Sequence, residues 1–190
     1  MDFLDQIIEY DKELFIYLNN WGSEPWDEFW LTITNQFSWI PLFLLLFYFI
    51  FKAYGWKKGL VLVLVAAALV TFSDQFVNLI KNGIARLRPN NDPTVKELIR
   101  ILKNPKGFSF ISGHSTTSFA VTTFMILTLR KYYKYTFSLL IWPLLFAYSR
   151  IYLGVHFPLD IFIGMLVGIL IGILFYKISL FFLKKVAVNS

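Results

Sequence analysis

Long apolar runs without a charged side chain constrain this chain more than any other feature. The run from Phe29 to Phe51 contains no charged residue, and the run from Gly59 to Ile80 contains only Asp74. A helix needs about 20 apolar residues to cross a hydrocarbon layer of about 30 Å. Hydrophobic residues make up 57% of the 190 residues, an excess too large for the core of a soluble domain of this length. The sequence therefore predicts an all-α membrane protein with one domain over residues 1–190.

Three further apolar runs extend this prediction. They lie at about Gly113 to Leu129, Tyr135 to Ser149 and Pro158 to Leu183. Lys177, inside the last run, can extend its ammonium group to the membrane surface. We therefore expect a bundle of about five transmembrane helices.

Two other segments have an amphipathic pattern. In residues 1–20 the acidic character argues against a cleaved signal peptide, and the apolar residues Leu4, Ile7, Ile8, Phe15 and Leu18 lie near one helical face. We expect an interfacial helix there, with packing on neighbouring helices as the alternative.

The second amphipathic segment is the loop of residues 90–107. Asp92 and Pro93 form a helix-start pair, and the residues after them place apolar and basic side chains on opposite faces. We expect a short interfacial helix that flanks a pocket and attracts anionic head groups, with a solvated connector helix as the alternative.

Five crossings assign every loop to one of two membrane sides. One side receives nine basic residues and no acidic residue, whereas the other holds all twelve acidic residues and the remaining nine basic ones. Short, purely basic loops are typical of the cytoplasmic side. The side with the N-terminus should therefore face the periplasm or the exterior of the cell (inner or plasma) membrane.

The residues that could bind a ligand or take part in a reaction lie at helix ends on this outer side. Three cations around one site indicate a multiply charged anion, for which phosphate is the best candidate. A helix that begins at Ser112 and Gly113 would direct its free N–H groups at such an anion, although an ordinary N-cap and turn explains Ser112 equally. The residues concerned are Lys81, Arg88, Ser112, Gly113, His114, Arg150, His156 and Asp160.

The two histidines suggest acid–base or nucleophilic chemistry. Asp160 follows His156 by four residues and can hold one ring nitrogen, which leaves the other free as a nucleophile or base, although both residues could merely cap a helix. Zinc is the competing explanation for two histidines and a carboxylate, but three nearby cations oppose a second positive centre. Because the chain has no cysteine, it has no thiol nucleophile and no thiolate metal ligand. We expect neither a metal nor a cofactor.

The order and spacing of these residues resemble the signature of a known family. Six residues separate Lys81 from Arg88-Pro89, Ser112-Gly113-His114 follows, and Ser149-Arg150 precedes His156 and Asp160. This arrangement is similar to the three-part signature of the type 2 phosphatidic acid phosphatases, whose superfamily also contains the vanadium haloperoxidases. The similarity extends over somewhat under half of the chain. Ile111 stands where the second part usually begins with proline, which affects the stiffness of the turn but removes no chemical group.

The resemblance implies a role for each of these residues. His156 would attack phosphorus and form a phosphohistidine, while Asp160 would hold its ring. His114 would protonate the departing oxygen and then activate water. Lys81, Arg88, Arg150, Ser112 and Gly113 would bind the phosphoryl oxygens, and no metal would take part.

The function expected from these residues is that of a membrane phosphatase with a lipid phosphate or pyrophosphate as substrate. Undecaprenyl pyrophosphate, phosphatidylglycerol phosphate, phosphatidic acid and lipid A phosphate all remain open. A phosphotransferase of the same superfamily is the first alternative, and a small transporter is a weaker one because the charges gather at one surface. The expected partners are the lipid and the bilayer, not a nucleic acid, and the sequence gives no oligomeric state. Asp74 is a further functional candidate, as a polar or ionic partner near the pocket.

Overall fold

The computed structural model describes residues 3–188, and the regular structure within them is entirely helical, which confirms the all-α prediction. The helices are α1 (Phe3–Asn19), α2 (Asp27–Thr34), α3 (Ile40–Ile84), α4 (Gly113–Leu129), α5 (Ile141–Tyr152) and α6 (Pro158–Val188). Short 3₁₀ turns occur at Glu24–Trp26, Gln36–Trp39, Pro89–Asn91, Lys96–Leu98 and Thr136–Leu140.

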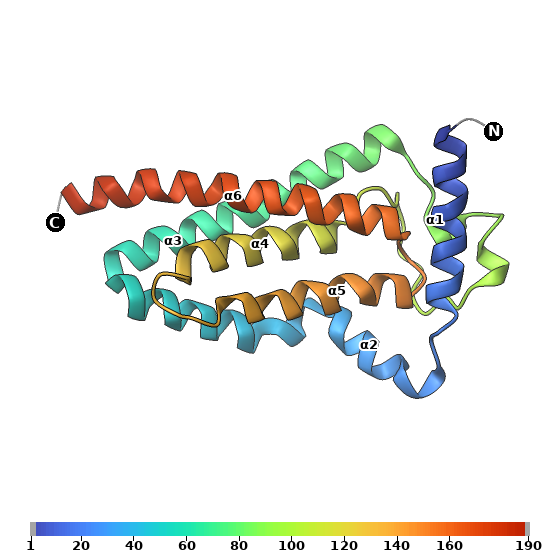
Figure 1. Ribbon diagram of the computed structural model, residues 1–190, viewed down its shortest axis with the longest axis horizontal. Coiled ribbons are helices and arrows are strands. Elements are labelled where there is room, and N and C mark those ends of the chain that lie inside the picture. Colours follow the sequence, from blue (N-terminus) through green and yellow to red (C-terminus); the bar gives the residue numbers. More distant parts are fainter. Residues whose placement is uncertain (1–2, 189–190) are drawn as a thin grey trace.

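Helix α3 consists of two arms that meet at Gly55. This residue has φ 70° and ψ 178°, a backbone conformation that only glycine adopts readily. The chain reverses direction there, so residues 40–54 and 56–84 run side by side (Figure 1). The reversal falls between the first two predicted spans, next to Lys52 and Lys57.

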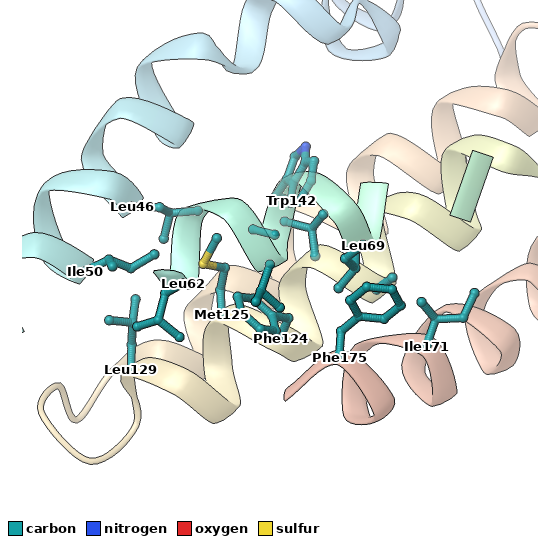
Figure 2. Close-up of a cluster of buried hydrophobic side chains, with 14 of the residues drawn as sticks. Leu46, Ile50, Leu62, Leu69, Phe124, Met125, Leu129, Trp142, Ile171 and Phe175 are labelled. Atoms are coloured by element: carbon teal, nitrogen blue, oxygen red, sulfur yellow. The ribbon is translucent and has the colours of Figure 1, made fainter. Parts of the chain in front are cut away.

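The two arms of α3 pack with α4, α5 and α6 along the long axis of the molecule (Figure 1). Their shared core contains Ile50 and Leu62 from the two arms, Phe124 from α4, Trp142 from α5 and Phe175 from α6 (Figure 2). Helix α4 is the most enclosed, because twelve of its 17 residues are buried. Its N-terminus is therefore held firmly from several sides.

Glycines allow α6 to lie against α4 at close range. A Cβ atom at Gly164 would lie 2.9 Å from the carbonyl oxygen of Ser112, and one at Gly172 would lie 2.6 Å from that of Ala120. Small residues at every fourth position are typical of such close helix contacts in membranes. This contact brings the beginnings of α4 and α6 together at one end of the bundle.

Two segments are long and apolar enough to cross a membrane, Gln36–Asn91 and Pro158–Val186. The first includes the reversal at Gly55 and therefore traverses the bundle twice. Helix α4, with 17 residues, and α5, with 12, are shorter than the roughly 20 residues that a full crossing needs. The membrane character is supported, and the number of five crossings stays a prediction.

The first predicted span, Phe29 to Phe51, begins too early in the sequence. Residues Phe29 to Thr34 belong to α2, and a 3₁₀ turn separates them from α3. The Asn35 side chain accepts a hydrogen bond of 3.1 Å from the Phe37 amide, and Pro41 stands in the first turn of α3. Capping by asparagine and a proline in the first turn both favour a new helix start at this point.

The prediction of an amphipathic helix within residues 90–107 is also wrong, because only 3₁₀ turns form there. Tertiary hydrogen bonds hold the loop in an irregular path instead. Asn19 donates to the carbonyl oxygen of Arg100 and accepts from its amide, at 3.1 and 2.8 Å, and the Leu102 amide donates to Leu153. These bonds use backbone groups that a helix would have paired internally.

The N-terminal helix is present and lies crosswise at one end of the bundle (Figure 1). Phe15 is completely buried against Phe157, with 5.2 Å between ring centroids, whereas Leu4 and Ile8 remain exposed. One side of α1 therefore packs on its neighbours, the alternative considered above. The interfacial placement of its other side stays a prediction.

Candidate active site

A cavity of about 780 Å³ lies between the arms of α3 and helices α4 and α5. Six of the eight predicted site residues line it, and its other walls include Phe43, Val63 and Val70. Ser112 and Asp160 are fully buried and are not part of the wall. The lining site residues are Lys81, Arg88, Gly113, His114, Arg150 and His156.

His156 is fixed from both sides of its buried ring. Its Nδ1 lies 3.3 Å from the Ser109 hydroxyl oxygen and 3.5 Å from Asp160 Oδ2, while its Nε2 lies 3.2 Å from Nη1 of Arg88. Because a guanidinium can only donate, Nε2 must carry a lone pair and Nδ1 the proton. Burial lowers the pKa of His156 to about 3, against the opposing effect of Asp160. The imidazole is therefore neutral, with Nε2 available as a nucleophile.

Asp160 is held by more contacts than its position in the sequence suggests. Its Oδ2 accepts hydrogen bonds from the Ser109 hydroxyl and, at 2.9 Å, from the Phe157 amide. Its Oδ1 accepts from Arg86 at 2.7 Å. Its backbone oxygen accepts from the Ser112 amide at 3.0 Å, which joins the start of α6 to the start of α4. The carboxylate can thus neither rotate nor leave the histidine.

Arg86 and Asp11 extend this arrangement to α1. Arg86 Nη2 lies 2.6 Å from Asp11 Oδ2, and the Leu159 amide donates to Asp11 Oδ1 at 2.8 Å. The Arg86 guanidinium also lies 4.2 Å from the ring centroid of Phe157. One guanidinium therefore joins two buried carboxylates, one of them Asp160.

The sequence reasoning missed Arg86, Ser109 and Asp11. Arg86 lies among the six residues between Lys81 and Arg88, where the resemblance assigns no role. Asp11 precedes the buried Phe15 by four residues and therefore points to the same side of α1. This spacing was the one available signal for Asp11, and no local pattern marked Ser109.

Two of the three predicted cations are anchored by protein oxygen atoms. Arg88 donates to the carbonyl oxygens of Val155, at 3.1 Å, and Gly107, at 3.2 Å. Arg150 donates to the Thr34 hydroxyl, but its buried Nε has no hydrogen-bond partner among residues 3–188. Buried donors are normally paired, so this nitrogen is an unsatisfied donor in a residue that lines the cavity. Lys81 is the third cation on the cavity wall.

The beginning of α4 contributes His114 and the end of a helix. Ser112 caps the helix by accepting a hydrogen bond of 3.4 Å from the Ser115 amide, as the N-cap alternative expected. Gly113 and His114 line the cavity, and the His114 ring packs 4.9 Å from that of Phe146. The first turn of α4 thus combines free backbone N–H groups with a second imidazole.

Comparisons with known proteins agree with this geometry. The family model of the PAP2 superfamily matches residues 57–183, which include all eight predicted site residues. A lipid A 4'-phosphatase of Bacteroides thetaiotaomicron is 33% identical over 94% of this chain and 80% of its own length. An undecaprenyl-diphosphatase of Sulfolobus acidocaldarius is 31% identical over 80% of this chain and 63% of its own length.

A solved structure has the same fold. The PAP2-type phosphatidylglycerolphosphate phosphatase of Bacillus subtilis aligns with a TM-score of 0.71 at 22% identity, over 92% of this chain and 86% of that one. The matching family model covers more than half of the chain and contains Arg86 and Ser109 together with the predicted site residues. The chain therefore belongs to the PAP2 superfamily and is a phosphoric-ester hydrolase.

Proposed function

We propose that this protein is a lipid phosphatase of the cell membrane that works through a phosphohistidine. The observation that carries the proposal is one cavity in which two imidazoles and three cations meet at one end, while apolar helix walls continue from it. A phosphate head group suits the cations, and the lipid tails suit the apolar walls. The predicted topology makes the periplasmic or outer face the side of catalysis.

In the first step, His156 Nε2 attacks phosphorus and the bond to the lipid oxygen breaks. Asp160 and Ser109 hold the proton on Nδ1, so the lone pair of Nε2 points away from them. His114 enters this step as an imidazolium, which the bound phosphate anion stabilises, and gives one proton to the departing lipid oxygen. The products of this step are a phosphohistidine and a lipid alcohol.

In the second step, water attacks the phosphorus atom of the phosphohistidine. His114, now without its proton, accepts a proton from that water, and the P–N bond breaks to release phosphate and restore neutral His156. Lys81, Arg88 and Arg150 stabilise the charge on the equatorial oxygens during both steps, helped by the amides at Gly113. The unpaired Nε of Arg150 is a donor that such an oxygen can satisfy.

Arg86 acts in this scheme as a positioning residue. It holds Asp160 through Oδ1 and is itself held by Asp11, so that Oδ2 stays directed at His156. Removal of its charge would leave two buried carboxylates near each other without the cation between them. Their repulsion would move Asp160 away from the imidazole.

For the substrate, the relatives favour a phosphorylated glycolipid such as lipid A over a prenyl pyrophosphate. The lipid A 4'-phosphatase matches 80% of its length, whereas the undecaprenyl-diphosphatase matches 63%. Water as the acceptor makes the protein a hydrolase and not a phosphotransferase. These assignments are tested with a panel of lipids.

The experiment uses protein purified in detergent with EDTA. Phosphate release is measured from lipid A, undecaprenyl pyrophosphate, phosphatidylglycerol phosphate and phosphatidic acid. We expect His156→Ala to abolish release, EDTA to have no effect, and an alkaline quench of the wild type to retain phosphate on the protein. Activity that survives His156→Ala or disappears with EDTA would contradict the mechanism, and dependence on an added alcohol would indicate a phosphotransferase.

A further inference from the structure

Asp74 and Asn78 form a polar patch on the cavity wall that the phosphatase chemistry does not use. Both residues line the cavity, and Asn78 Nδ2 donates to Asp74 Oδ2 at 3.3 Å. They lie on α3 at one and two turns before Lys81, on the same helical face. The patch is thus continuous with the phosphate-binding end of the cavity.

The charge of Asp74 is not explained by an ion pair. Among residues 3–188 no cation lies within salt-bridge distance of its carboxylate, and Asp74 Oδ1 and Asn78 Oδ1 have no hydrogen-bond donor. A carboxylate inside an apolar transmembrane segment is costly and is usually retained for a function. Lys81 acts on Asp74 electrostatically but makes no direct contact with it, so Asp74 Oδ1 is open to a donor from a bound substrate.

The position of the patch decides which part of a substrate it meets. A helix rises about 1.5 Å per residue, so Asn78 lies roughly 4.5 Å and Asp74 roughly 10 Å along α3 from Lys81. Both side chains are exposed on the cavity wall, on the side of Lys81 that leads along α3 toward Gly55 and the apolar walls. A carboxylate would repel the phosphoryl group itself, so the patch must contact the atoms that connect phosphate and tails.

Only some lipids have a suitable group there. The two free oxygens are acceptors, and they require hydroxyl or amide N–H donors. An acylated amino sugar carries such donors beside its phosphate. A prenyl phosphate has only hydrocarbon beyond the ester oxygen, and phosphatidic acid has only ester acceptors. Phosphatidylglycerol phosphate offers one glycerol hydroxyl but no amide N–H.

We infer that Asp74 and Asn78 are a specificity subsite for phosphorylated amino-sugar lipids, given that the proposed function holds. The subsite accepts hydrogen bonds from the hydroxyl and amide N–H groups next to the phosphate. It receives no such bond from a prenyl phosphate or from phosphatidic acid, and these lipids leave the Asp74 carboxylate covered by apolar chain without a donor. Selectivity then comes from a penalty on the wrong lipid as well as from a gain with the right one.

The test is a change in selectivity after Asp74→Leu, which keeps the approximate size of the side chain and removes both carboxylate oxygens of Asp74. The readout is the ratio of kcat/KM for a tetraacylated glucosamine disaccharide phosphate to kcat/KM for undecaprenyl phosphate, in the same detergent. We expect this ratio to fall about tenfold or more, because hydrogen bonds to a charged group are lost on one substrate only. The fall should arise mainly from KM for the glycolipid.

Two further variants complete the design. Asn78→Leu retains the Asp74 charge and should reduce the same ratio by a smaller factor. Thr71→Val is the matched control, because Thr71 lies on the same arm of α3, does not line the cavity and bonds only to the Ala67 carbonyl oxygen. It should leave the ratio unchanged.

The outcomes separate this inference from the proposed function. An unchanged ratio in Asp74→Leu, or an equal loss on both lipids, would overturn the subsite while phosphate release through His156 stands. A wild type that prefers prenyl or diacylglycerol phosphates would overturn it as well. Asp74→Asn, which keeps one acceptor oxygen, serves as the second variant if the leucine variant does not fold. Loss of the phosphohistidine route is detected separately with His156→Ala.

Discussion

Two arginines join the N-terminal helices to the rest of the molecule, and they do so with different partners. Arg86 lies between Asp11 of α1 and Asp160 of α6, and the three side chains are 18%, 5% and 0% exposed. Arg100 lies against Asp27 of α2 at 2.9 Å, and the two side chains are 29% and 18% exposed. Both are guanidinium–carboxylate contacts that involve one of the first two helices.

The two contacts differ in the third side chain that takes part in each. Arg86 contacts the carboxylate that holds the proposed nucleophile, whereas Arg100 shares Asp27 with the Tyr152 hydroxyl, which donates to Asp27 at 2.7 Å. Tyr152 lies at the end of α5, outside the cavity wall. The same pair of residue types therefore lies next to the proposed catalytic centre in one place and between packed helices in the other.

The largest effect is expected for Arg86→Met. Breaking a buried ion pair costs about 3–5 kcal/mol, and here it leaves two buried carboxylates unpaired. A displaced Asp160 misaligns His156, and a misplacement of about 1 Å can reduce the rate on the order of 100-fold. We expect kcat for phosphate release to fall by about this factor while KM changes little.

Arg86→Lys tests whether Arg86 positions Asp160 or only stabilises the fold. An ammonium group restores the charge but cannot bond both carboxylates in the fork geometry of a guanidinium. Its kcat should lie between those of the wild type and Arg86→Met. If both variants keep the kcat of the wild type, Arg86 has no part in holding Asp160.

A smaller loss is expected for Asp11→Asn. The asparagine oxygen can still accept from the Leu159 amide, but Arg86 loses one of its two charged partners. Loss of a charged hydrogen bond corresponds to roughly tenfold if it is fully transmitted to kcat. Initial rates at saturating lipid measure this effect, and a loss as large as that of Arg86→Met would mean that α1 alone sets the position of Asp160.

The comparison also indicates what a sequence can predict. The residues Lys81, Arg88, His114, Arg150 and His156 were predicted from short local patterns, and the structure brings all five to one cavity. Helix boundaries at Gly113 and Pro158 were predictable for the same reason, because an N-cap serine and a first-turn proline act locally. Local sequence patterns therefore predicted which of these side chains line the cavity.

The parts that were missed depend on distant contacts. Arg86 and Asp11 are 75 residues apart, and nothing near either one indicates the other. The loop of residues 90–107 has the pattern of an amphipathic helix, but the Asn19 side chain, 81 residues away from Arg100, takes up its backbone groups. Contacts of this kind form only once α1 has docked, so periodicity cannot reveal them.

Arg100→Met tests the second contact, between Arg100 and Asp27. Its partners do not line the cavity, so kcat should remain close to that of the wild type. Loss of the contact with Asp27 and Tyr152 should instead lower the melting temperature in detergent. A fall in kcat without a fall in melting temperature would show that the α2 contact also reaches the catalytic centre.

The smallest effect is expected in the pH dependence of stability, where the two carboxylates should behave oppositely. The pKa of Asp27 is lowered, chiefly by the hydrogen bond from the Tyr152 hydroxyl, with Arg100 acting in the same direction and burial opposing both. The pKa of Asp11 is raised above its ordinary value of 3.8, because burial outweighs its contacts with Arg86 and Leu159. The two shifts have opposite consequences for folding.

A group with a lowered folded pKa stabilises the fold above its unfolded pKa, and this contribution is lost as the pH falls through the folded value. For a group with a raised pKa, the contribution is present below the unfolded value and is lost as the pH rises through the folded one. Wild type should therefore gain stability relative to Asp27→Asn as the pH rises from acid to neutral. Relative to Asp11→Asn it should lose stability over the same change.

Melting temperatures of the wild type and both variants in detergent, from acid to neutral pH, measure the two differences. The difference between wild type and Asp27→Asn should increase with pH, and that between wild type and Asp11→Asn should decrease. If both increase together, the Arg86 charge outweighs burial at Asp11. If they diverge, the charge on Asp11 is kept at neutral pH at a cost in stability, as expected for a carboxylate whose task is to hold Arg86 against Asp160.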